Sequence, residues 1–355
     1  MPTKEPTTTS GKKVRIVDIA KAAGVGASTV TAALNPRATG NSRVSPATAD
    51  RIRRVAEKLG YRANLAARQL RGGASGMIGV LFNSLFGEVN HLRLSALEKQ
   101  ARKRGVRLLI AQFENDAGEV AAYLEDFESR GLEGILALNH EMPDDTRAIP
   151  AALSRHERVV YLDPPASDRS AAALNINYAG GIQKAVMHLL ERGRGNIAMA
   201  IADDVFLPGK ARLRGYRKAM KQAGLDEMLW IGSHQNDWRP DLADNIGDEA
   251  VETIVERLVI SGKADAIIAS NDLWAVQLVK ALKRRGYKVP KDVAIIGFNN
   301  SAVCWACEPE LTSIEVNSDV LAGGMIELMS GQSDKQGRDR IRQTLEPELV
   351  VRAST

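Results

Sequence analysis

Apolar residues near the start of the chain recur at helical spacing in three short stretches. The positions that share one face of each stretch are, in chain order, Ile16, Ile19 and Ala20, then Val30 and Leu34, then Ile52, Val55 and Leu59. Only Ala23-Gly24-Val25-Gly26 separates the first two stretches, so the chain must turn sharply between them. Three short helices packed around such a turn are typical of a helix-turn-helix domain, whose second helix enters the major groove of DNA.

The rest of the chain shows a different pattern, in which short apolar runs alternate with amphipathic stretches. Runs of strand length cover residues 78–82, 107–111, 134–138, 158–162, 196–201, 266–269 and 293–298. Stretches of helical length cover residues 89–104, 180–192, 210–223, 248–261 and 272–285. This alternation predicts parallel sheets with helices on both faces, and the length is enough for two such lobes. Ligands of these sheets bind at the carboxyl ends of the strands.

Charge is divided unevenly along the chain. Residues 1–71 contain fourteen Lys or Arg and four Asp or Glu, a balance of +10, whereas the remainder contains 34 basic and 39 acidic residues, a balance of −5. A basic domain suits binding to nucleic acid, because neutralised phosphates release counterions. The alternative for a run of charge is a solvated helix face. Because the excess is confined to the helix-turn-helix region, we interpret it as a DNA-binding surface.

Several sequence motifs carry a resemblance to a known family. They are VDIAKAAGV, the TV...LN pair after the turn, RVS...LGYRANLAARQLR, ARLRGY, ASNDLWA, VAIIGFNN and PELTSI. With them the chain resembles the LacI/GalR (lactose-repressor) family of transcriptional regulators, and the resemblance runs to the final VVRAST. Only the first dozen residues fall outside it, and their polar, Pro/Thr-rich composition predicts that residues 1–13 form a disordered tail.

The resemblance implies a fold with an N-terminal all-α head and an α/β core. The helix-turn-helix domain is expected over 14–63 and a hinge helix with a linker over 64–76. Residues 77–355 are expected to form a core similar to periplasmic binding proteins, with two doubly wound lobes. Lobe one would comprise 77–192 and 318–340, and lobe two 193–317 and 341–355. The chain would then cross between the lobes near Glu191-Arg192, near Asn317 and near Arg340.

DNA contacts are implied by matching the head to the family. They are expected from Ala27, Ser28 and Ala32 at base edges, from Thr29, Thr31 and Asn35 at phosphates, and also from Arg15, Arg43 and Tyr61. Ala32 departs from the family, which usually has a long polar side chain there. Alanine offers only a methyl contact, whereas bidentate recognition of guanine needs Arg or Lys, so Ser28 is the remaining hydrogen-bonding reader. Gly26 also replaces the usual serine as a weaker N-cap.

The loop of residues 36–43 is about four residues longer than is common in the family. We hypothesise that Arg37 or Arg43 compensates for the short side chains of the recognition helix by reaching phosphate or a groove edge. The alternative is a solvated loop arginine. Unchanged operator affinity and sequence preference after substitution of each by alanine would contradict the hypothesis.

A hinge helix is implied from Asn64, with Ala67 as its small contact residue and Leu70 as a wedge in the minor groove. Such a wedge kinks the duplex, and a helix this short is marginal unless two subunits meet on DNA. The alternative is that Leu70 packs between domains. The hinge therefore implies a homodimer that binds a pseudo-palindromic DNA operator.

The resemblance implies an effector site between the lobes. Arg212 would bind the ligand through its forked guanidinium, Trp238 would stack on the ligand ring, and the Asn271 amide would form hydrogen bonds with the ligand. The structural alternatives are a surface arginine, a core aromatic and a helix N-cap. Asn299 stands where the family usually has Asp, and the lost charge favours an acceptor or anionic ligand such as a uronic acid or sugar phosphate. Phe86 is expected to face the cleft from the other lobe.

Other chemistry finds little support in the sequence. Cys304 and Cys307 form a single CxxC without a nearby His, which is a weak zinc signal, and we expect packing cysteines with redox sensing as the alternative. No phosphate loop, GxSxG or HExxH motif occurs, so we predict no enzyme, no metal and no cofactor. No apolar run is long enough for a signal peptide or a membrane span, so we expect a cytoplasmic protein.

The resulting prediction is a DNA-binding regulator, expected to be a repressor, whose operator affinity changes when a sugar or sugar derivative binds between the lobes. The ligand would act by shifting the population of two states. The alternative is a ligand-binding module of the periplasmic type without DNA-directed regulation. The basic head and the lack of a signal peptide argue against that alternative.

Overall fold

The computed structural model describes residues 14–34, 44–61, 75–83, 87–114, 116–141, 145, 147–165, 172–202, 206–232, 246–331 and 342–355. The chain divides into two compact units, Met1–Ser75 and Gly76–Thr355. We refer to them as the head and the core and describe each by itself.

The head contains three helices, α1 (Ile16–Ala23), α2 (Ala27–Leu34) and α3 (Pro46–Lys58). Gly24, with a φ of 63°, ends α1 in the left-handed conformation that glycine adopts without strain. Ser45 caps α3 by accepting a hydrogen bond from the Thr48 N–H, at 3.3 Å. Gly24 thus marks the end of α1, and Ser45 marks the beginning of α3.

The core of the head is built from small and β-branched residues on the inner helix faces. Its buried members are Ile19, Ala20, Ala23, Val30, Ala33, Ala49, Ile52 and Ala56. The expectation that Leu59 packs there is wrong. Leu59 is 39% exposed, because α3 ends just before it, and Ala56 is the last buried residue of that helix.

No single helix of the described chain is long and apolar enough to cross a membrane. Only α1 and α2 taken together reach the required length and composition, and they are bent by 104° relative to each other. Three of the apolar residues in this pair, Ile19, Val30 and Ala33, are buried in the head.

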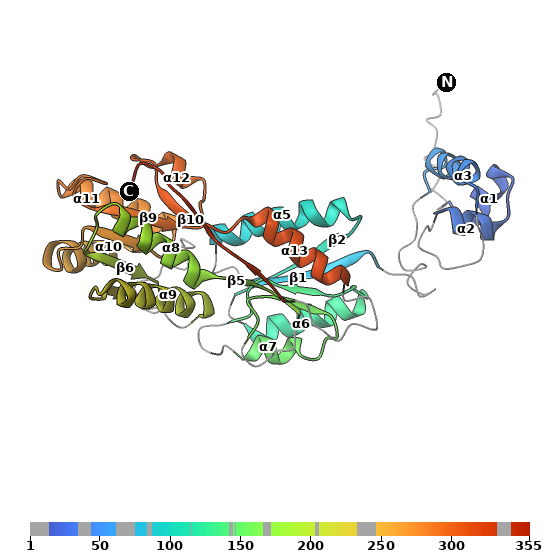
Figure 1. Ribbon diagram of the computed structural model, residues 1–355. Helices are drawn as coiled ribbons and strands as arrows, with labels where there is room; N and C mark the ends of the chain where they lie inside the picture. The colour runs from blue at the N-terminus through green and yellow to red at the C-terminus, as the bar shows by residue number, and fades with distance from the viewer. Residues whose placement is uncertain are drawn as a thin grey trace, which may run out of the picture. The chain divides into compact units, whose positions relative to one another are not determined.

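The first lobe of the core is a six-stranded parallel sheet between two layers of helices (Figure 1). The strands, in sheet order, are β11 (Arg342–Leu345), β5 (Ala172–Ile176), β4 (Val159–Leu162), β3 (Ile135–Ala137), β1 (Met77–Asn83) and β2 (Arg107–Phe113). Helices α5 (Gly87–Lys103) and α13 (Ser318–Gly331) pack together on one face, and α6 (Ala117–Ser129) and α7 (Ala148–Leu153) on the other.

The second lobe repeats this plan. Its strands, in sheet order, are β12 (Glu348–Val350), β10 (Thr312–Glu315), β9 (Ala294–Phe298), β8 (Ala266–Ala269), β6 (Ile197–Ile201) and β7 (Met228–Ile231), and only β12 is antiparallel to its neighbour. Helices α8 (Tyr178–Glu191) and α9 (Leu207–Ala223) cover one face, and α10 (Asp248–Ile254) and α11 (Asp272–Arg284) the other. A short helix, α12 (Val303–Ala306), follows β9.

The chain changes lobes at positions that partly differ from the prediction. The first crossing lies at Asn177, between β5 and α8, and not near Glu191-Arg192, because α8 packs on α9 and on the second sheet. The second lies between β10 and α13, near Asn317 as expected. The third lies at Glu346-Pro347 and not near Arg340, because β11 still pairs with β5 of the first lobe.

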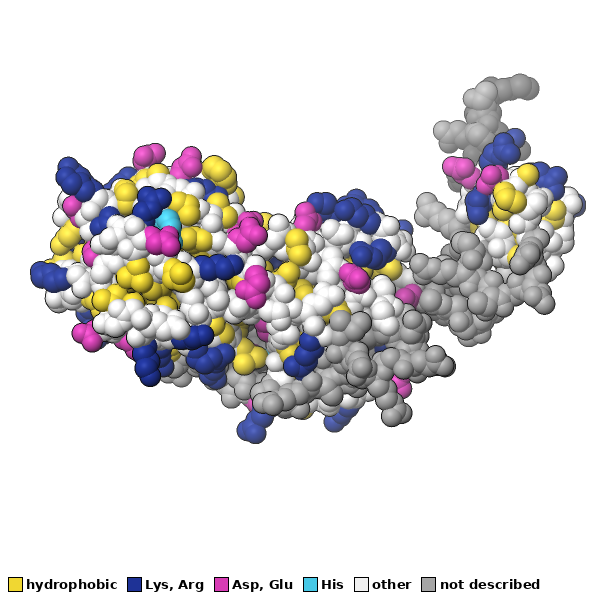
Figure 2. Space-filling view, viewed as in Figure 1, with side chains coloured by type: hydrophobic (Ala, Val, Ile, Leu, Met, Phe, Trp, Pro, Cys, Tyr) yellow, Lys and Arg dark blue, Asp and Glu magenta, His cyan; other side chains and the backbone are white. Residues whose placement is uncertain are grey.

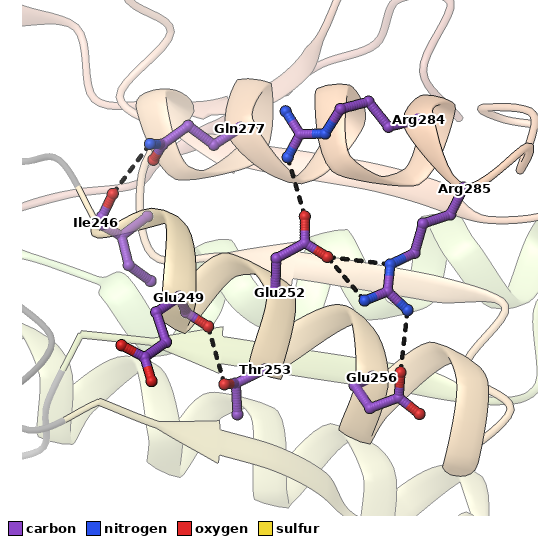
Figure 3. A network of polar contacts seen from close by, with 8 residues as sticks. All are labelled: Ile246, Glu249, Glu252, Thr253, Glu256, Gln277, Arg284 and Arg285. Carbon is purple, nitrogen blue, oxygen red and sulfur yellow. Dashed lines mark hydrogen bonds and ion pairs between the residues drawn. The ribbon is translucent and has the colours of Figure 1, made fainter.

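Residues 248–261, predicted as one helix, form α10 followed by a π-helical segment, Val255–Ser261. Ion pairs tie this stretch to the end of α11 (Figure 3). Glu252 pairs with Arg284 at 3.0 Å and with Arg285 at 2.8 Å, and Arg285 also reaches Glu256 at 3.0 Å. The hydrogen bonds from the two arginines lower the pKa of Glu252. The network links the end of α11 to α10 and the π-helical segment, and the N-terminus of α11 carries site residues.

The surface of the core carries both signs of charge. In the view of Figure 2, Lys and Arg side chains over the core are interspersed with Asp and Glu. This mixture agrees with the small acidic balance of the core sequence. No broad basic face of the core is visible from this side.

Candidate functional site

The outer face of the recognition helix α2 is formed by the residues that do not pack into the core of the head. Val30 and Ala33 are buried, so Ala27 and Ser28 are exposed, while Thr31 and Ala32 are half-buried. The Thr31 hydroxyl donates to the Ala27 carbonyl within the helix, at 2.9 Å. Its proton is therefore committed to the helix in this conformation, and Ser28 presents the exposed hydroxyl of the first turn.

Two further head residues of the prediction are described. The Arg15 backbone N–H donates to the Asp18 carboxylate at 2.8 Å, and its side chain is exposed. Tyr61 is half-buried against the head core, and its N–H donates to the Ala56 carbonyl at 2.9 Å. Thr29, also half-buried, lies in the first turn of α2.

Several predicted site residues lie outside the described residues. They are Asn35, Arg37 and Arg43 in the head, Asn64, Ala67 and Leu70 in the hinge, and Phe86 and Trp238 in the core. Their roles stay predictions.

In the core, a small pocket forms between α5 of the first lobe and the strand ends of the second. Its walls are Val89, Leu92, Asn271, Asp272, Leu273, Asn299 and Ser301. The structure thus brings Asn271 and Asn299, which are 28 residues apart in sequence, to one cavity. Arg212 is not among its walls.

The sequence left open whether Asn271 caps a helix, and the structure shows that it does. It is the N-cap of α11, and its Oδ1 accepts from the Trp274 N–H at 2.9 Å. Asn299 and Asn300 follow β9 with φ of 103° and 51°, a left-handed region that Asn tolerates better than most residues. The Asn299 N–H donates to the Ile314 carbonyl at 2.8 Å, which fixes this bend at the pocket.

Asp272 is a pocket residue that sequence reasoning did not single out. Its carboxylate accepts from the Ser301 N–H at 2.7 Å and from the Ser313 hydroxyl at 2.5 Å. Burial raises its pKa to about 6. The Cys304 thiol also bonds this carboxylate, and burial raises the thiol pKa to about 12.

The cysteines of the CxxC motif are therefore poor nucleophiles. Cys304 and Cys307 are both free and buried, and burial raises the pKa of each thiol. A thiol reacts as the thiolate, which a raised pKa disfavours. Among the described residues, no three His, Cys, Asp or Glu side chains are arranged to hold a metal ion.

Arg212 lies beside the pocket in a group of aromatic and charged residues. Its guanidinium carbon lies 3.8 Å from the centre of the Phe298 ring and 5.3 Å from that of Tyr178. Its Nη1 donates to the Ser270 carbonyl at 2.7 Å. Stacking on two rings and a bond to a strand end position this side chain at the carboxyl edge of the second sheet.

Asp163 joins this group from the first lobe. Its two carboxylate oxygens accept from the Ile176 N–H at 2.8 Å and from the Tyr178 hydroxyl at 2.9 Å. Burial raises its pKa to about 6, against the opposing effect of these bonds and of the positive charges of Arg93 and Arg212. Because Tyr178 begins α8, this contact bridges the two lobes at the first crossing.

A second bridge between the lobes lies nearby. Glu141, which follows the end of the β3 region, accepts from the Leu207 N–H at 2.8 Å. Leu207 is the first residue of α9, so a carboxylate of one lobe sits at the positive end of a helix of the other. His140, just before it, is buried edge-on against Tyr161 and bonds the Asp163 carbonyl through Nε2 at 2.6 Å.

Sequence signals for the missed residues differ in strength. Asp163 directly follows a predicted strand, so the rule that ligands bind at strand ends could have found it. Arg93 has no such signal, because an arginine on an amphipathic helix is usually solvated.

Two parts of the chain match known families. Residues 15–64 match "Bacterial regulatory proteins, lacI family", and residues 186–355 match "Periplasmic binding protein-like domain". The HTH-type transcriptional regulator DegA of Bacillus subtilis (strain 168) is 29% identical over 352 residues, which cover 97% of this chain and 98% of DegA. The regulator CelR of Thermobifida fusca is 26% identical, with coverage of 95% and 96%.

Solved structures share the fold. The lac repressor dimer bound to operator and the anti-inducer ONPF superposes with a TM-score of 0.77 at 21% identity, over 97% of this chain and 99% of that chain. The complex of CelR with cellobiose superposes with a TM-score of 0.64 at 23% identity, over 97% and 100%. The head thus matches the lacI family of bacterial regulatory proteins, and the second part of the core matches the periplasmic binding protein-like domain. The chain is similar along nearly its whole length to transcriptional regulators such as DegA.

Proposed function

We propose that this protein is a sequence-specific transcriptional regulator, acting as a repressor, whose affinity for operator DNA is set by a small molecule. The observation that carries this proposal is one chain with a lacI-type head and a two-lobed core, in which residues of both lobes line one small pocket. A head alone would bind DNA, and a core alone would bind a ligand. Their combination supports a ligand-controlled DNA-binding protein in the cytoplasm.

DNA binding would use two heads of a homodimer on a pseudo-palindromic operator. Ser28 would read a base edge, Ala27 and Ala32 would contribute methyl contacts, and Arg15 would contact phosphate. The hinge, with Leu70 as wedge, would order as the two subunits meet on DNA. The solved lac repressor dimer is bound to its operator, which supports this arrangement.

The effector would bind between the lobes and bias their relative angle. A ligand shifts such an equilibrium only by its difference in affinity for the two states. Asn271 and Asn299 belong to one lobe, whereas Val89 and Leu92 belong to the other, so a ligand in this pocket contacts both. CelR is solved with cellobiose, which supports a sugar or sugar derivative as the class of effector.

The test is a binding selection with the full-length protein on genomic fragments, repeated with single compounds from a panel of sugars, uronic acids and sugar phosphates. We expect a palindromic sequence to be retained and one compound to change its retention. Specific binding that no compound changes would contradict the effector part of the proposal. Absence of any specific DNA binding would contradict the regulator, and a ligand-binding module would then be the better description.

A further inference from the structure

We propose that the core binds the phosphate backbone of the operator through three residues of its first lobe, Lys103, Arg104 and Arg107, which we call the basic patch. The proposal rests on the regulator function above and adds a contact with DNA outside the head. The partner is double-stranded DNA, recognised by the charge of its phosphates and not by its base sequence.

The basic patch belongs to a stretch whose charge is opposite to that of the core. Residues 98–107 contain five Lys or Arg and one Asp or Glu, a balance of +4, although the core as a whole has a balance of −5. In Figure 2, a small group of Lys and Arg side chains lies over the end of α5. An acidic domain is repelled by DNA, so a positive surface favours the approach of phosphates at this place.

The charges of the basic patch face the solvent, because all three of its residues are exposed. The ion pairs of this part of α5 use other basic residues. Glu98 pairs with Arg102 at 2.7 Å. Asp319 pairs with Lys99 at 2.8 Å and so links α13 to α5. A phosphate can therefore reach the basic patch from the solvent.

The end of a helix explains only part of this cluster. The last carbonyl groups of a helix carry partial negative charge, which stabilises basic residues in the last turn. This accounts for Arg102 and Lys103, because α5 ends at Lys103. Arg104 lies beyond that end, and Arg107 is the first residue of β2. The helix dipole therefore leaves the charges of Arg104 and Arg107 unexplained.

The basic patch lies at the edge of the first sheet where the chain arrives from the head. Arg107 is paired with Met77, the first residue of β1, and its N–H donates to the Gly76 carbonyl at 2.8 Å. Gly76 is the first residue of the core. This corner of the core is therefore the part that is nearest along the chain to the DNA-binding head. That position favours DNA over an acidic protein as the partner of the patch.

The size of the basic patch suits a nucleic-acid backbone. Lys103 and Arg107 are four residues apart, so their Cα atoms lie within about 15 Å of each other. Each strand of DNA carries one phosphate per ~3.4 Å of helix axis. The long side chains of the patch can therefore contact more than one phosphate of a strand.

The core offers a comparable set of basic residues for use as a control. Helix α9 of the second lobe carries Arg214, Lys218 and Lys221, all exposed. This helix lies between β6 and β7, far along the chain from the residue at which the core begins. If charge alone mattered, the two sets would contribute equally to DNA binding, whereas our proposal assigns the contact to the basic patch.

The test measures the affinity of the full-length protein for the operator that the binding selection recovers, at several salt concentrations. The patch variant combines Lys103→Gln, Arg104→Gln and Arg107→Gln. The control variant combines Arg214→Gln, Lys218→Gln and Lys221→Gln, so both lose the same net charge. Substitutions at exposed positions usually leave stability nearly unchanged, so both variants should fold.

The expected result follows from counterion release. The logarithm of the affinity falls with the logarithm of the salt concentration, with a slope of about −0.9 per neutralised phosphate. With at least one contact from each protomer of a dimer, the patch variant should lose about 1.8 or more from the magnitude of this slope. Its affinity at 0.1 M salt should fall at least about tenfold, whereas the control variant should keep the wild-type slope.

The same titrations with a fragment that lacks the operator give a second readout. Phosphate contacts carry no sequence information, so the affinities of the patch variant for both DNAs should fall by the same factor. A changed ratio of the two affinities would overturn the proposal, because the effect would then pass through base recognition by the head.

Two other results would also overturn the proposal. An unchanged slope in the patch variant would exclude the phosphate contact and leave an acidic protein as the partner of the patch. An equal loss of slope in both variants would show an effect of net charge alone. Failure of the regulator function appears differently, as the absence of specific DNA binding by the wild-type protein.

Discussion

Replacing Gly215 with alanine tests whether the close contact between α8 and α9 sets the geometry of the site. A Cβ at Gly215 would lie 2.5 Å from the Ala179 carbonyl oxygen and 2.6 Å from its Cα. Ordinary contact begins at 3.4 Å, so the two helices must separate by about 0.9 Å. The obstacle is backbone and cannot turn aside as a side chain would.

The expected cost follows from two opposing effects. Overpacking against rigid neighbours costs about 3 kcal/mol, the upper end of its usual range. Alanine in place of glycine inside a helix returns about 1 kcal/mol. We therefore expect the free energy of unfolding of the core to fall by about 2 kcal/mol.

The displacement should also reach the site. Ala179 adjoins Tyr178, whose hydroxyl bonds Asp163 at 2.9 Å, and Arg212 lies about one turn before Gly215 on α9. A shift near 1 Å would break the Tyr178 bond and move Arg212 from the Phe298 ring. We expect effector affinity to fall at least tenfold, consistent with loss of one charge-assisted contact.

Urea denaturation followed by circular dichroism, together with effector titration, measures both effects. The matched control is Gly323→Ala on α13, where an added Cβ meets nothing within 4 Å. That variant should be as stable as wild type or more stable by up to about 1 kcal/mol. A Gly215→Ala protein with wild-type stability and effector response would refute the argument from helix contact.

Three other substitutions test the head and the pocket. Ile52→Ala creates a cavity at a fully buried position of the small head. We expect the free energy of unfolding of the head to fall by about 2–5 kcal/mol and operator binding to be lost. Differential scanning calorimetry should show the core transition unchanged, and a retained head transition would contradict this prediction. Ser28→Ala should weaken operator binding about tenfold without changing its salt dependence, because the substitution removes a contact with a base and leaves the phosphate contacts in place. Anisotropy titrations at several salt concentrations measure both the affinity and its salt dependence. A changed salt slope would mean that Ser28 contacts phosphate. Burial raises the pKa of Asp272 to about 6, so the folded core holds a proton between about pH 4 and 6 that the unfolded chain has lost, and the stability from this group falls as pH rises through that window. Asp272→Asn should flatten this dependence, because the amide does not titrate, and should lower stability at pH 4, because the amide nitrogen cannot accept the hydrogen bond from Ser301 or Ser313; urea titrations across pH would contradict it if both proteins lose stability in parallel.

The elements that the sequence predicted well are those with strong local patterns. The three helices of the head and seven strands of the core coincide with their apolar periodicity to within a few residues. Other elements lack such a pattern. The edge strand β11 (RQTL) is polar and half-exposed, β12 has only three residues, and α13 contains Gly323-Gly324. These segments adopt their structure because a neighbouring strand or helix offers hydrogen bonds and an apolar surface.

The crossings between lobes were misplaced for a related reason. Helix α8 has the amphipathic pattern of any helix that covers a sheet, and the pattern does not say which sheet. Close contacts at glycine residues decide which sheet α8 covers. Gly181 lets α8 approach Ile314 and Pro347, and Gly215 lets α9 approach Ala179, so α8 fits the second lobe.

The sequence by itself determined the head, its basic charge, the alternation of strands and helices, and the placement of Asn271 and Asn299 after strands, because these depend on periodicity, composition and motif order along the chain. The tertiary structure decided which charges are buried together. Asp163, Tyr178 and Arg212 come from both lobes and contact one another through the Tyr178 side chain. Desolvation and Coulomb interactions depend on distance in space, so no local pattern records that these three side chains share one low-dielectric site.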